Sequence, residues 1–182
     1  MLLLGPAPDF WPHFTQSPEW LDGKPDAMDR WSTRVLNRLA DDMGGEAMFP
    51  FGGEPFLPFF SWALKSGQAW QSPVNLLVHA QAGLMVSYRG ALALPYEIDL
   101  PPAAEKPCDT CDKPCLSACN AGALTGDGYD VPACKSFLTT EKGRENMALG
   151  CNVRRACPVS QSYARMSEQS AYHMRVFMGE NR

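Results

Sequence analysis

The sequence predicts an α+β protein in two parts, a sheet-and-helix domain over residues 1–100 and a smaller lobe over residues 101–182. Strand-like and helix-like segments succeed one another through the first part, which contains no cysteine. All seven cysteines lie in the second part, between Cys108 and Cys157. The stretch Pro95–Pro107 contains four prolines, a composition typical of a linker, and separates the two parts.

Composition and charge are those of a globular protein. Hydrophobic residues make up 45% of the chain and charged residues 20%, which argues against disorder. The net charge of −4 provides no basic surface for nucleic acid. No stretch approaches the ~20 apolar residues that a membrane helix needs, and Met1–Leu4 is too short for a secretory signal. We therefore expect a cytoplasmic protein that binds neither nucleic acid nor membrane.

A short strand and a long helix open the predicted first domain. Met1–Leu4 is apolar and predicts a buried strand, whereas Pro6–Pro25 is rich in proline and aromatic residues and predicts a loop. Asp26 is typical of a helix N-cap, and Gly44–Gly45 is expected to end that helix. The apolar residues between them recur at helical spacing and predict a buried stripe, made of Met28, Trp31, Val35, Leu39 and Met43.

Shorter elements follow along the chain. The further predicted strands are a strand and turn within Ala47–Pro58, then Val74–His79 and Leu84–Leu94. The further predicted helices are Phe59–Lys65, Val131–Thr139 and Pro158–Glu168, the last of which leads into a helical tail. Gln81–Gly83 is expected to join the last two strands as a hairpin, with a bulge at Gly90.

The spacing of the cysteines is the most specific signal in the sequence. The run Cys108-x2-Cys111-x3-Cys115-x3-Cys119 is similar to the bacterial ferredoxin run C-x2-C-x2-C-x3-C-P, with one extra residue in the middle gap. The remaining cysteines are Cys134, Cys151 and Cys157, and Pro158 follows the last of them. Gaps of two and three residues bring successive thiolates to neighbouring irons of a cubane cluster, and a remote Cys-Pro is expected to supply the fourth thiolate.

Disulfides and zinc are the alternative uses of these cysteines. Disulfides are disfavoured because an odd count leaves one cysteine unpaired and because no secretory signal is recognised. Zinc sites built from four cysteines usually show two C-x2-C pairs, whereas this chain has one. Zinc remains the alternative metal for a centre that only stabilises the fold.

Short sequences around the cysteines extend the pattern. They are, in chain order, Cys108–Cys119, Ala121–Leu124, Ala133–Leu138, Gly150-Cys151 and Ala156-Cys157-Pro158. This order resembles the C-terminal, ferredoxin-type lobe of epoxyqueuosine reductase, a family similar to reductive dehalogenases and to the cobalamin-trafficking protein of methylmalonic aciduria type C. Upstream, Leu76–His79 leading to Leu100–Pro102 is similar to the last core strands and linker of the reductase. The resemblance implies a small nitroreductase-like or cobalamin-reductase-like domain followed by a ferredoxin-like iron–sulfur lobe.

The resemblance also implies how the cysteines are divided between two clusters. One [4Fe–4S] cluster would be bound by Cys108, Cys111, Cys115 and Cys157. A second would be bound by Cys119, Cys134 and Cys151. The family carries one more cysteine where this chain has Asn152–Ala156. Three alternatives follow for the second site: a three-iron cluster, a cluster with a non-cysteine ligand, or no cluster.

The chain departs from the family at the reductase's catalytic aspartate. The matching stretch Phe51–Pro55 offers Glu54 but no aspartate, and the chain is much shorter than the full enzyme. We therefore expect a truncated relative that does not reduce epoxyqueuosine, with cobalamin binding as a minor alternative. The histidines His13, His79 and His173 lie in no catalytic motif, so the sequence assigns no catalytic residue.

The function expected from these observations is electron transfer by an iron–sulfur protein of ferredoxin type, as a component of an oxidoreductase system. Its partner would be a redox protein or a small-molecule acceptor. Arg154 and Arg155, between two expected ligands, would raise a cluster's potential or attract an acidic partner. The alternatives are a non-catalytic binding module stabilised by zinc or an inert cluster, and a cobalamin-dependent reductase with altered specificity.

Overall fold

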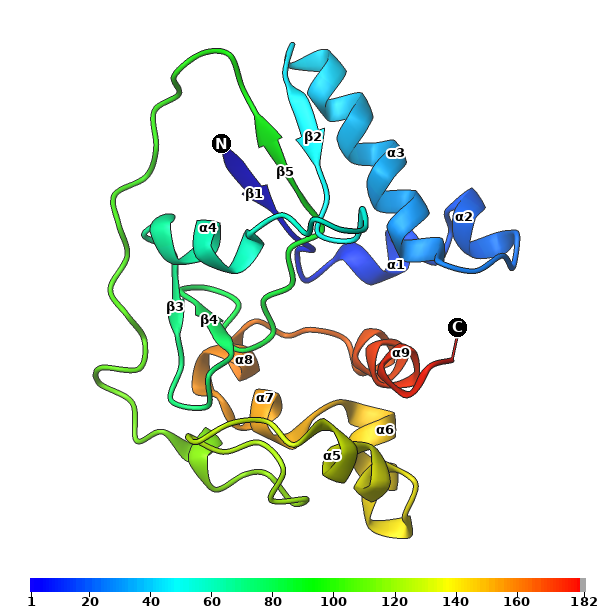
Figure 1. The fold of residues 1–182 in the computed structure, drawn as a ribbon, viewed down its shortest axis with the longest axis vertical. Helices are drawn as coiled ribbons and strands as arrows, with labels where there is room; N and C mark the ends of the chain where they lie inside the picture. Colours follow the sequence, from blue (N-terminus) through cyan, green and yellow to red (C-terminus); the bar gives the residue numbers. More distant parts are fainter. Residues whose placement is uncertain (181–182) are drawn as a thin grey trace. The chain divides into compact units, whose positions relative to one another are not determined.

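The computed structural model describes residues 1–180 and is mixed α+β (Figure 1). The chain forms two compact units. The first unit combines Met1–Gly67 with Ser87–Ala103, and the second combines Gln68–Val86 with the chain from Ala104 onward. The predicted division at residue 100 lies close to the last crossing of the chain between the units. The prediction placed residues 68–86 in the first part, whereas in the structure they belong to the second unit, with the cysteines.

A three-stranded antiparallel sheet forms the centre of the first unit. Its strands are β1 (Leu2–Leu4), β5 (Gly90–Ala93) and β2 (Glu46–Met48), in the order β1-β5-β2. Ala91 of the central strand pairs with Leu3 on one side and with Met48 on the other. Ala91 and Leu92 are fully buried. The strands predicted at the N-terminus and after residue 46 are confirmed.

Helix α3 (Ala27–Asp42) packs along β2 and β5 of this sheet (Figure 1). Its predicted position and its end at Gly44, where φ is +60°, are confirmed. The predicted stripe is wrong in part, because Leu39 is exposed and the buried face is Met28, Ser32, Leu36 and Ala40. A Cβ at Gly90 would lie 2.4 Å from Leu36 Cδ1, so glycine permits this close approach of helix and strand instead of forming the predicted bulge.

Two short helices occupy part of the segment predicted as a loop. They are α1 (Phe10–Phe14) and α2 (Pro18–Leu21). Ser17 accepts a hydrogen bond from the Trp20 amide at 3.3 Å and Pro18 takes the first helical position, which is a helix-start signal that the aromatic composition obscured. The aromatic side chains form the core here, and the fully buried Phe14 ring contacts Trp11, Trp20 and Trp31.

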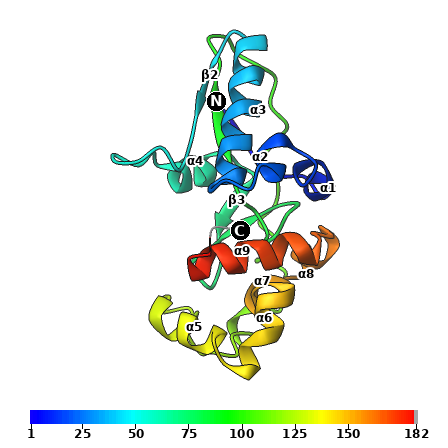
Figure 2. The same cartoon turned by 90° about the vertical axis from the view of Figure 1, so that its right-hand side faces the viewer.

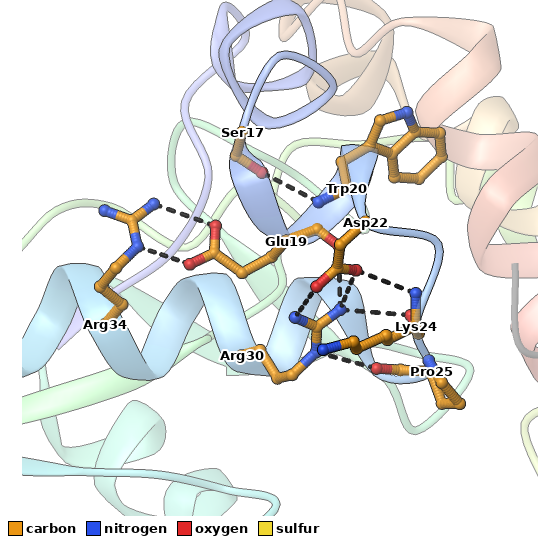
Figure 3. Close-up of polar contacts among 8 residues, drawn as sticks. All are labelled: Ser17, Glu19, Trp20, Asp22, Lys24, Pro25, Arg30 and Arg34. Atoms are coloured by element: carbon orange, nitrogen blue, oxygen red, sulfur yellow. Dashed lines mark hydrogen bonds and ion pairs between the residues drawn. The ribbon is translucent and has the colours of Figure 1, made fainter.

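Ion pairs join α2 and its following turn to α3. Figure 3 shows the Arg34 guanidinium facing the Glu19 carboxylate, with Arg34 Nη2 3.0 Å from Glu19 Oε2. Arg30 binds Asp22 beside it, through Nη1 at 2.9 Å. The Arg34 guanidinium lowers the pKa of Glu19, against an opposing effect of burial. The last helix of the first unit is α4 (Phe59–Lys65), as predicted.

The second unit begins with a small antiparallel pair of strands, β3 (Ala69–Gln71) and β4 (Leu77–His79). The predicted hairpin between β4 and the strand that includes β5 is wrong, because the two strands belong to different sheets. Leu84 shows why: its amide donates to Ser160 Oγ and its carbonyl oxygen accepts from Arg154, so neither is available to a strand.

Helices make up most of the remaining regular structure of the second unit. They are α5 (Val131–Leu138), α6 (Arg144–Leu149), α7 (Asn152–Ala156), α8 (Pro158–Ser162) and α9 (Ser167–Met178), with short 3₁₀ turns at Pro114–Leu116 and Glu141–Gly143. The helix predicted near Val131 is confirmed. The one predicted from Pro158 to Glu168 breaks at Ala164, where φ is +53°, and α9 then packs against α6 (Figure 2). Within residues 1–180 no helix is both long and apolar enough to cross a bilayer.

The apolar core of the second unit is shared between the β3–β4 segment and the cysteine region. Its buried members are Val74, Val78, Leu84, Cys115, Leu124, Val153 and Cys157. Three of them precede the first cysteine by more than twenty residues in the sequence, yet they pack against Cys115 and Cys157. Residues 68–86 therefore complete the hydrophobic surroundings of the cysteines.

Candidate metal centre

Four of the seven cysteines line a single pocket in the second unit. They are Cys108, Cys111, Cys115 and Cys157, the four residues expected to bind the first cluster. The empty space in the pocket, including the part open to solvent, is about 260 Å³. Cys157 is the remote member, 42 residues after Cys115, and the fold brings it back to the run.

Local backbone structure presents each of these thiols. Cys115 lies in a 3₁₀ turn that follows Lys113, whose backbone is left-handed with φ at 56°. Cys157 lies where α7 ends and α8 begins, in an extended conformation with ψ at 123°. Pro158 imposes that conformation, because the residue before a proline is disfavoured in the helical region. The Cys-Pro pair therefore breaks the helix at the point where a thiol faces the pocket.

Burial and neighbouring thiols raise the pKa of two of these cysteines, Cys108 and Cys115. Cys115 and Cys157 are 6% and 8% exposed. Burial, followed by the neighbouring Cys157 and Cys111, raises the pKa of the Cys115 thiol. Burial and then Cys115 raise the pKa of Cys108. A positively charged centre that binds several thiolates at once would remove this repulsion.

Backbone amides donate to sulfur at both groups of cysteines. The Lys113 amide lies 3.3 Å from Cys111 Sγ, and the Leu124 amide lies 3.3 Å from Cys119 Sγ. Such N–H···S hydrogen bonds from tight turns are a feature of iron–sulfur ligation, where they stabilise the sulfur charge. Four thiols line one pocket, and a backbone amide donates a hydrogen bond to one of their sulfurs. This arrangement fits a [4Fe–4S] cluster.

The three cysteines that do not line this pocket make up the second group. Cys134 lies on α5, Cys151 precedes α7, and Cys119 follows the 3₁₀ turn. Burial is the largest cause of the raised pKa of the Cys134 thiol, and Cys151 and Cys119 raise this pKa further. Cys151 and Cys119 are therefore close enough to Cys134 to influence its thiol.

Tyr129 is a polar neighbour of the second group that sequence reasoning missed. Burial is the largest cause of its raised pKa, and its hydroxyl and the Cys134 thiol influence one another, which raises the pKa of Tyr129 further and opposes the rise in the pKa of Cys134. The Tyr129 ring stacks on Phe177 of α9 with centroids 6.3 Å apart. Tyr129 lies five residues before Cys134 and gave no signal in the sequence, because it is the fold that places its hydroxyl near the Cys134 thiol.

The two arginines between Cys151 and Cys157 have different surroundings. Arg154 donates through Nη1 to the carbonyl oxygen of Leu84, and burial lowers its pKa while Cys151 and Tyr129 raise it. Within residues 1–180, no carboxylate forms an ion pair with Arg154. Arg155 instead binds the exposed Glu145 carboxylate at 2.7 Å. Arg154 is thus a cation close to Cys151 and Tyr129.

Two other candidate groups, His79 and Glu54, belong to different units. His79 Nδ1 accepts from the amides of Gln81 and Ala82 at 3.1 and 3.3 Å, which closes the turn after β4. Glu54 lies exposed in a turn. In the described part of the chain, no three His, Cys, Asp or Glu side chains form a group that could hold a metal ion. A [4Fe–4S] cluster takes its four thiolates at four different irons, so the shared pocket is the relevant geometry for it.

Comparison with models of protein families, with curated proteins and with solved structures finds no match to this chain. All seven thiols are free of disulfide bonds, and each belongs to one of the two groups.

Proposed function

We propose that this chain is an iron–sulfur electron-transfer protein of ferredoxin type, with a [4Fe–4S] cluster on Cys108, Cys111, Cys115 and Cys157. The observation that supports this most directly is that these four thiols line one pocket. A cluster of this class, when bound, accepts and releases a single electron. The electron would come from a reduced redox partner and pass to an oxidised partner protein or small molecule.

The surroundings of the pocket suit this role. Val78 and Leu84 line it with apolar surface, and the Lys113 amide donates to one of its sulfurs. Apolar surroundings exclude water, and amide donors stabilise charge on sulfur, so both help set the potential of a cluster. Cys111 is only half-buried, which leaves one side of the pocket near solvent for electron exchange.

A second centre on Cys119, Cys134 and Cys151 is part of the proposal. Three thiolates suit a three-iron cluster, and the Tyr129 hydroxyl is the neighbouring group that could act as a non-cysteine ligand to a fourth iron. The Arg154 guanidinium would offset the negative charge of either form. Two centres in one unit would allow an electron to pass between them.

The family relationship belongs to the same proposal. The second unit would be a ferredoxin-like lobe related to that of epoxyqueuosine reductase, and the first a reduced form of a nitroreductase-like or cobalamin-reductase-like domain. Free thiols and a net charge of −4 support a cytoplasmic component of an oxidoreductase system that does not bind nucleic acid. Cobalamin binding remains the minor alternative, to be tested by a titration that follows the cobalamin spectrum.

A second candidate function is a binding module that a metal stabilises without redox chemistry. Cys115 and Cys157 belong to the apolar core of the second unit, so any metal bound there would stabilise its fold. Zinc or a cluster that is not reduced would serve this purpose. The two functions differ in whether the centre changes its oxidation state.

The deciding experiment is metal analysis of protein purified without oxygen. Iron, sulfide and zinc would be measured per chain, with electron paramagnetic resonance before and after dithionite. About four irons with matching sulfide and a signal that changes on reduction are expected for one cluster, and about seven or eight for two. One zinc without sulfide would rule out electron transfer and leave the binding module.

A further inference from the structure

Ser72 is a buried serine in the wall of the four-cysteine pocket. It follows β3 directly and is 4% exposed. Its amide donates to the Leu76 carbonyl oxygen at 2.8 Å, and its own carbonyl oxygen accepts from the Asn75 amide at 3.0 Å. Within residues 1–180, the Ser72 hydroxyl oxygen has no hydrogen-bond partner. The backbone of this residue is thus satisfied while its side chain is not.

An unpaired buried hydroxyl is costly, and native proteins rarely leave one without a reason. Around Ser72 the pocket offers apolar side chains, Val78 and Leu84, and the thiols of four cysteines. The remaining lining residues are Lys113, Pro114 and Pro158. Sulfur is therefore the acceptor that this pocket supplies to the hydroxyl.

The position of Ser72 is fixed by the hairpin that carries it. Pro73 follows and restricts the backbone, and the Ser72–Asn75 hydrogen bond closes the turn. Asn75 Nδ2 donates to the Gly126 carbonyl oxygen at 2.8 Å, which joins the turn to the loop after Cys119. A hydroxyl held in this way needs no rearrangement to meet a group that enters the pocket.

We propose that the Ser72 hydroxyl donates a hydrogen bond to a sulfur of the cluster in this pocket and thereby raises its reduction potential. This inference rests on the proposed function. Reduction adds an electron, and part of the added negative charge resides on the sulfurs. A hydrogen-bond donor to sulfur stabilises the reduced state more than the oxidised state, so it shifts the potential upward.

The test compares Ser72→Ala with wild-type protein prepared without oxygen. Iron content is measured first, and the midpoint potential follows from a redox titration monitored by paramagnetic resonance. Ser72→Ala is expected to keep its iron and to show a lower potential. Ser72→Thr, which retains a hydroxyl, is expected to remain near the wild-type value. Ser167→Ala, at an exposed serine that does not line the pocket, is the matched control and is expected to leave the potential unchanged.

An unchanged potential in an iron-loaded Ser72→Ala variant would overturn the inference and leave the proposed function intact. Absence of iron and sulfide from the wild-type protein would overturn the proposed function itself, and the inference with it. If Ser72→Ala loses its iron, Ser72→Thr and Ser72→Val decide, because they have nearly the same shape and differ in the hydroxyl. Iron retained by the threonine variant and lost by the valine variant supports the inference, and equal behaviour of the two contradicts it.

Discussion

The amide of Leu84 donates a hydrogen bond of 2.8 Å to the hydroxyl oxygen of Ser160, which lies 76 positions later in the sequence. The carbonyl oxygen of the same residue accepts from Arg154. Leu84 therefore makes hydrogen bonds with one residue that precedes Cys157 in the sequence and with one that follows it. A Cβ at Gly83 would lie 2.5 Å from the Ser160 nitrogen, so the two segments approach as closely as glycine allows. These contacts hold residues 68–86 in the unit that carries the cysteines.

Ser160→Ala is expected to lower the free energy of unfolding by about 1–3 kcal/mol, because it leaves the buried Leu84 amide without an acceptor. Denaturant unfolding at equal metal content measures the effect. Ser162→Ala, at an exposed position of the same helix, is the control and is expected to change stability by less than about 0.5 kcal/mol. Equal stability of the two variants would contradict the role assigned to Ser160.

The two groups of cysteines are expected to lose metal independently. Cys111→Ala and Cys134→Ala remove one half-buried thiol from each group. Iron and sulfide analysis of Cys134→Ala should still give about four irons, with the centre in the four-cysteine pocket retained. Cys111→Ala should lose that centre. A four-iron signal that survives in Cys111→Ala and disappears in Cys134→Ala would reverse the assignment.

Arg154 and Arg155 are expected to differ in their effect on potential, although they are neighbours. Arg154→Met removes the cation beside Cys151 and Tyr129, which should lower the potential of the second centre or empty it of metal. Arg155→Met removes a cation whose partner, Glu145, is largely exposed, and surface pairs of this kind contribute only about 0–1 kcal/mol. Redox titration of both variants checks this. Equal shifts of potential in the two variants would contradict the role assigned to Arg154.

The Glu19–Arg34 pair is expected to make stability depend on acid pH. Because Arg34 lowers the pKa of Glu19 in the folded chain, the stabilisation is complete above the unfolded value of about 4.3 and is lost as the pH falls through the lower folded value. Glu19→Gln should flatten this part of the profile of melting temperature against pH. Glu141→Gln, whose partner Arg144 is equally exposed at 76%, is the control and should keep the wild-type profile.

Local signals predicted several elements of the fold, and long-range contacts explain the failures. The spacing of apolar residues predicted the extent of α3. The buried face includes Leu36 and Ala40 instead of the predicted Leu39, because the sheet packs against that side of the helix. The hairpin between β4 and β5 failed for a different reason. Leu84 is apolar and suits a strand, yet its backbone is taken by Ser160 and Arg154, which no local pattern could indicate.

The cysteines of the site could be named from the sequence, but their surroundings could not. Thiol spacing predicted a metal, and the division into four and three came from the resemblance rather than from spacing alone. Ser72 gave no signal, because a serine before a proline is commonplace in turns. The burial of its hydroxyl in the pocket depends on the β3–β4 pair lying beside the cysteine run, and that contact spans more than thirty residues of sequence.

The separation between Leu84 and Ser160 also sets an order for biosynthesis. At about 5–20 residues per second, the 76 positions between them take the ribosome roughly 4–15 s to translate. During that interval Val74, Val78 and Leu84 are made but their later partners, Val153 and Cys157, are not. The nascent chain therefore carries an unpartnered apolar segment for several seconds. The pocket receives its fourth thiol only when Cys157 has been synthesised, so the four-thiol site does not exist before that point.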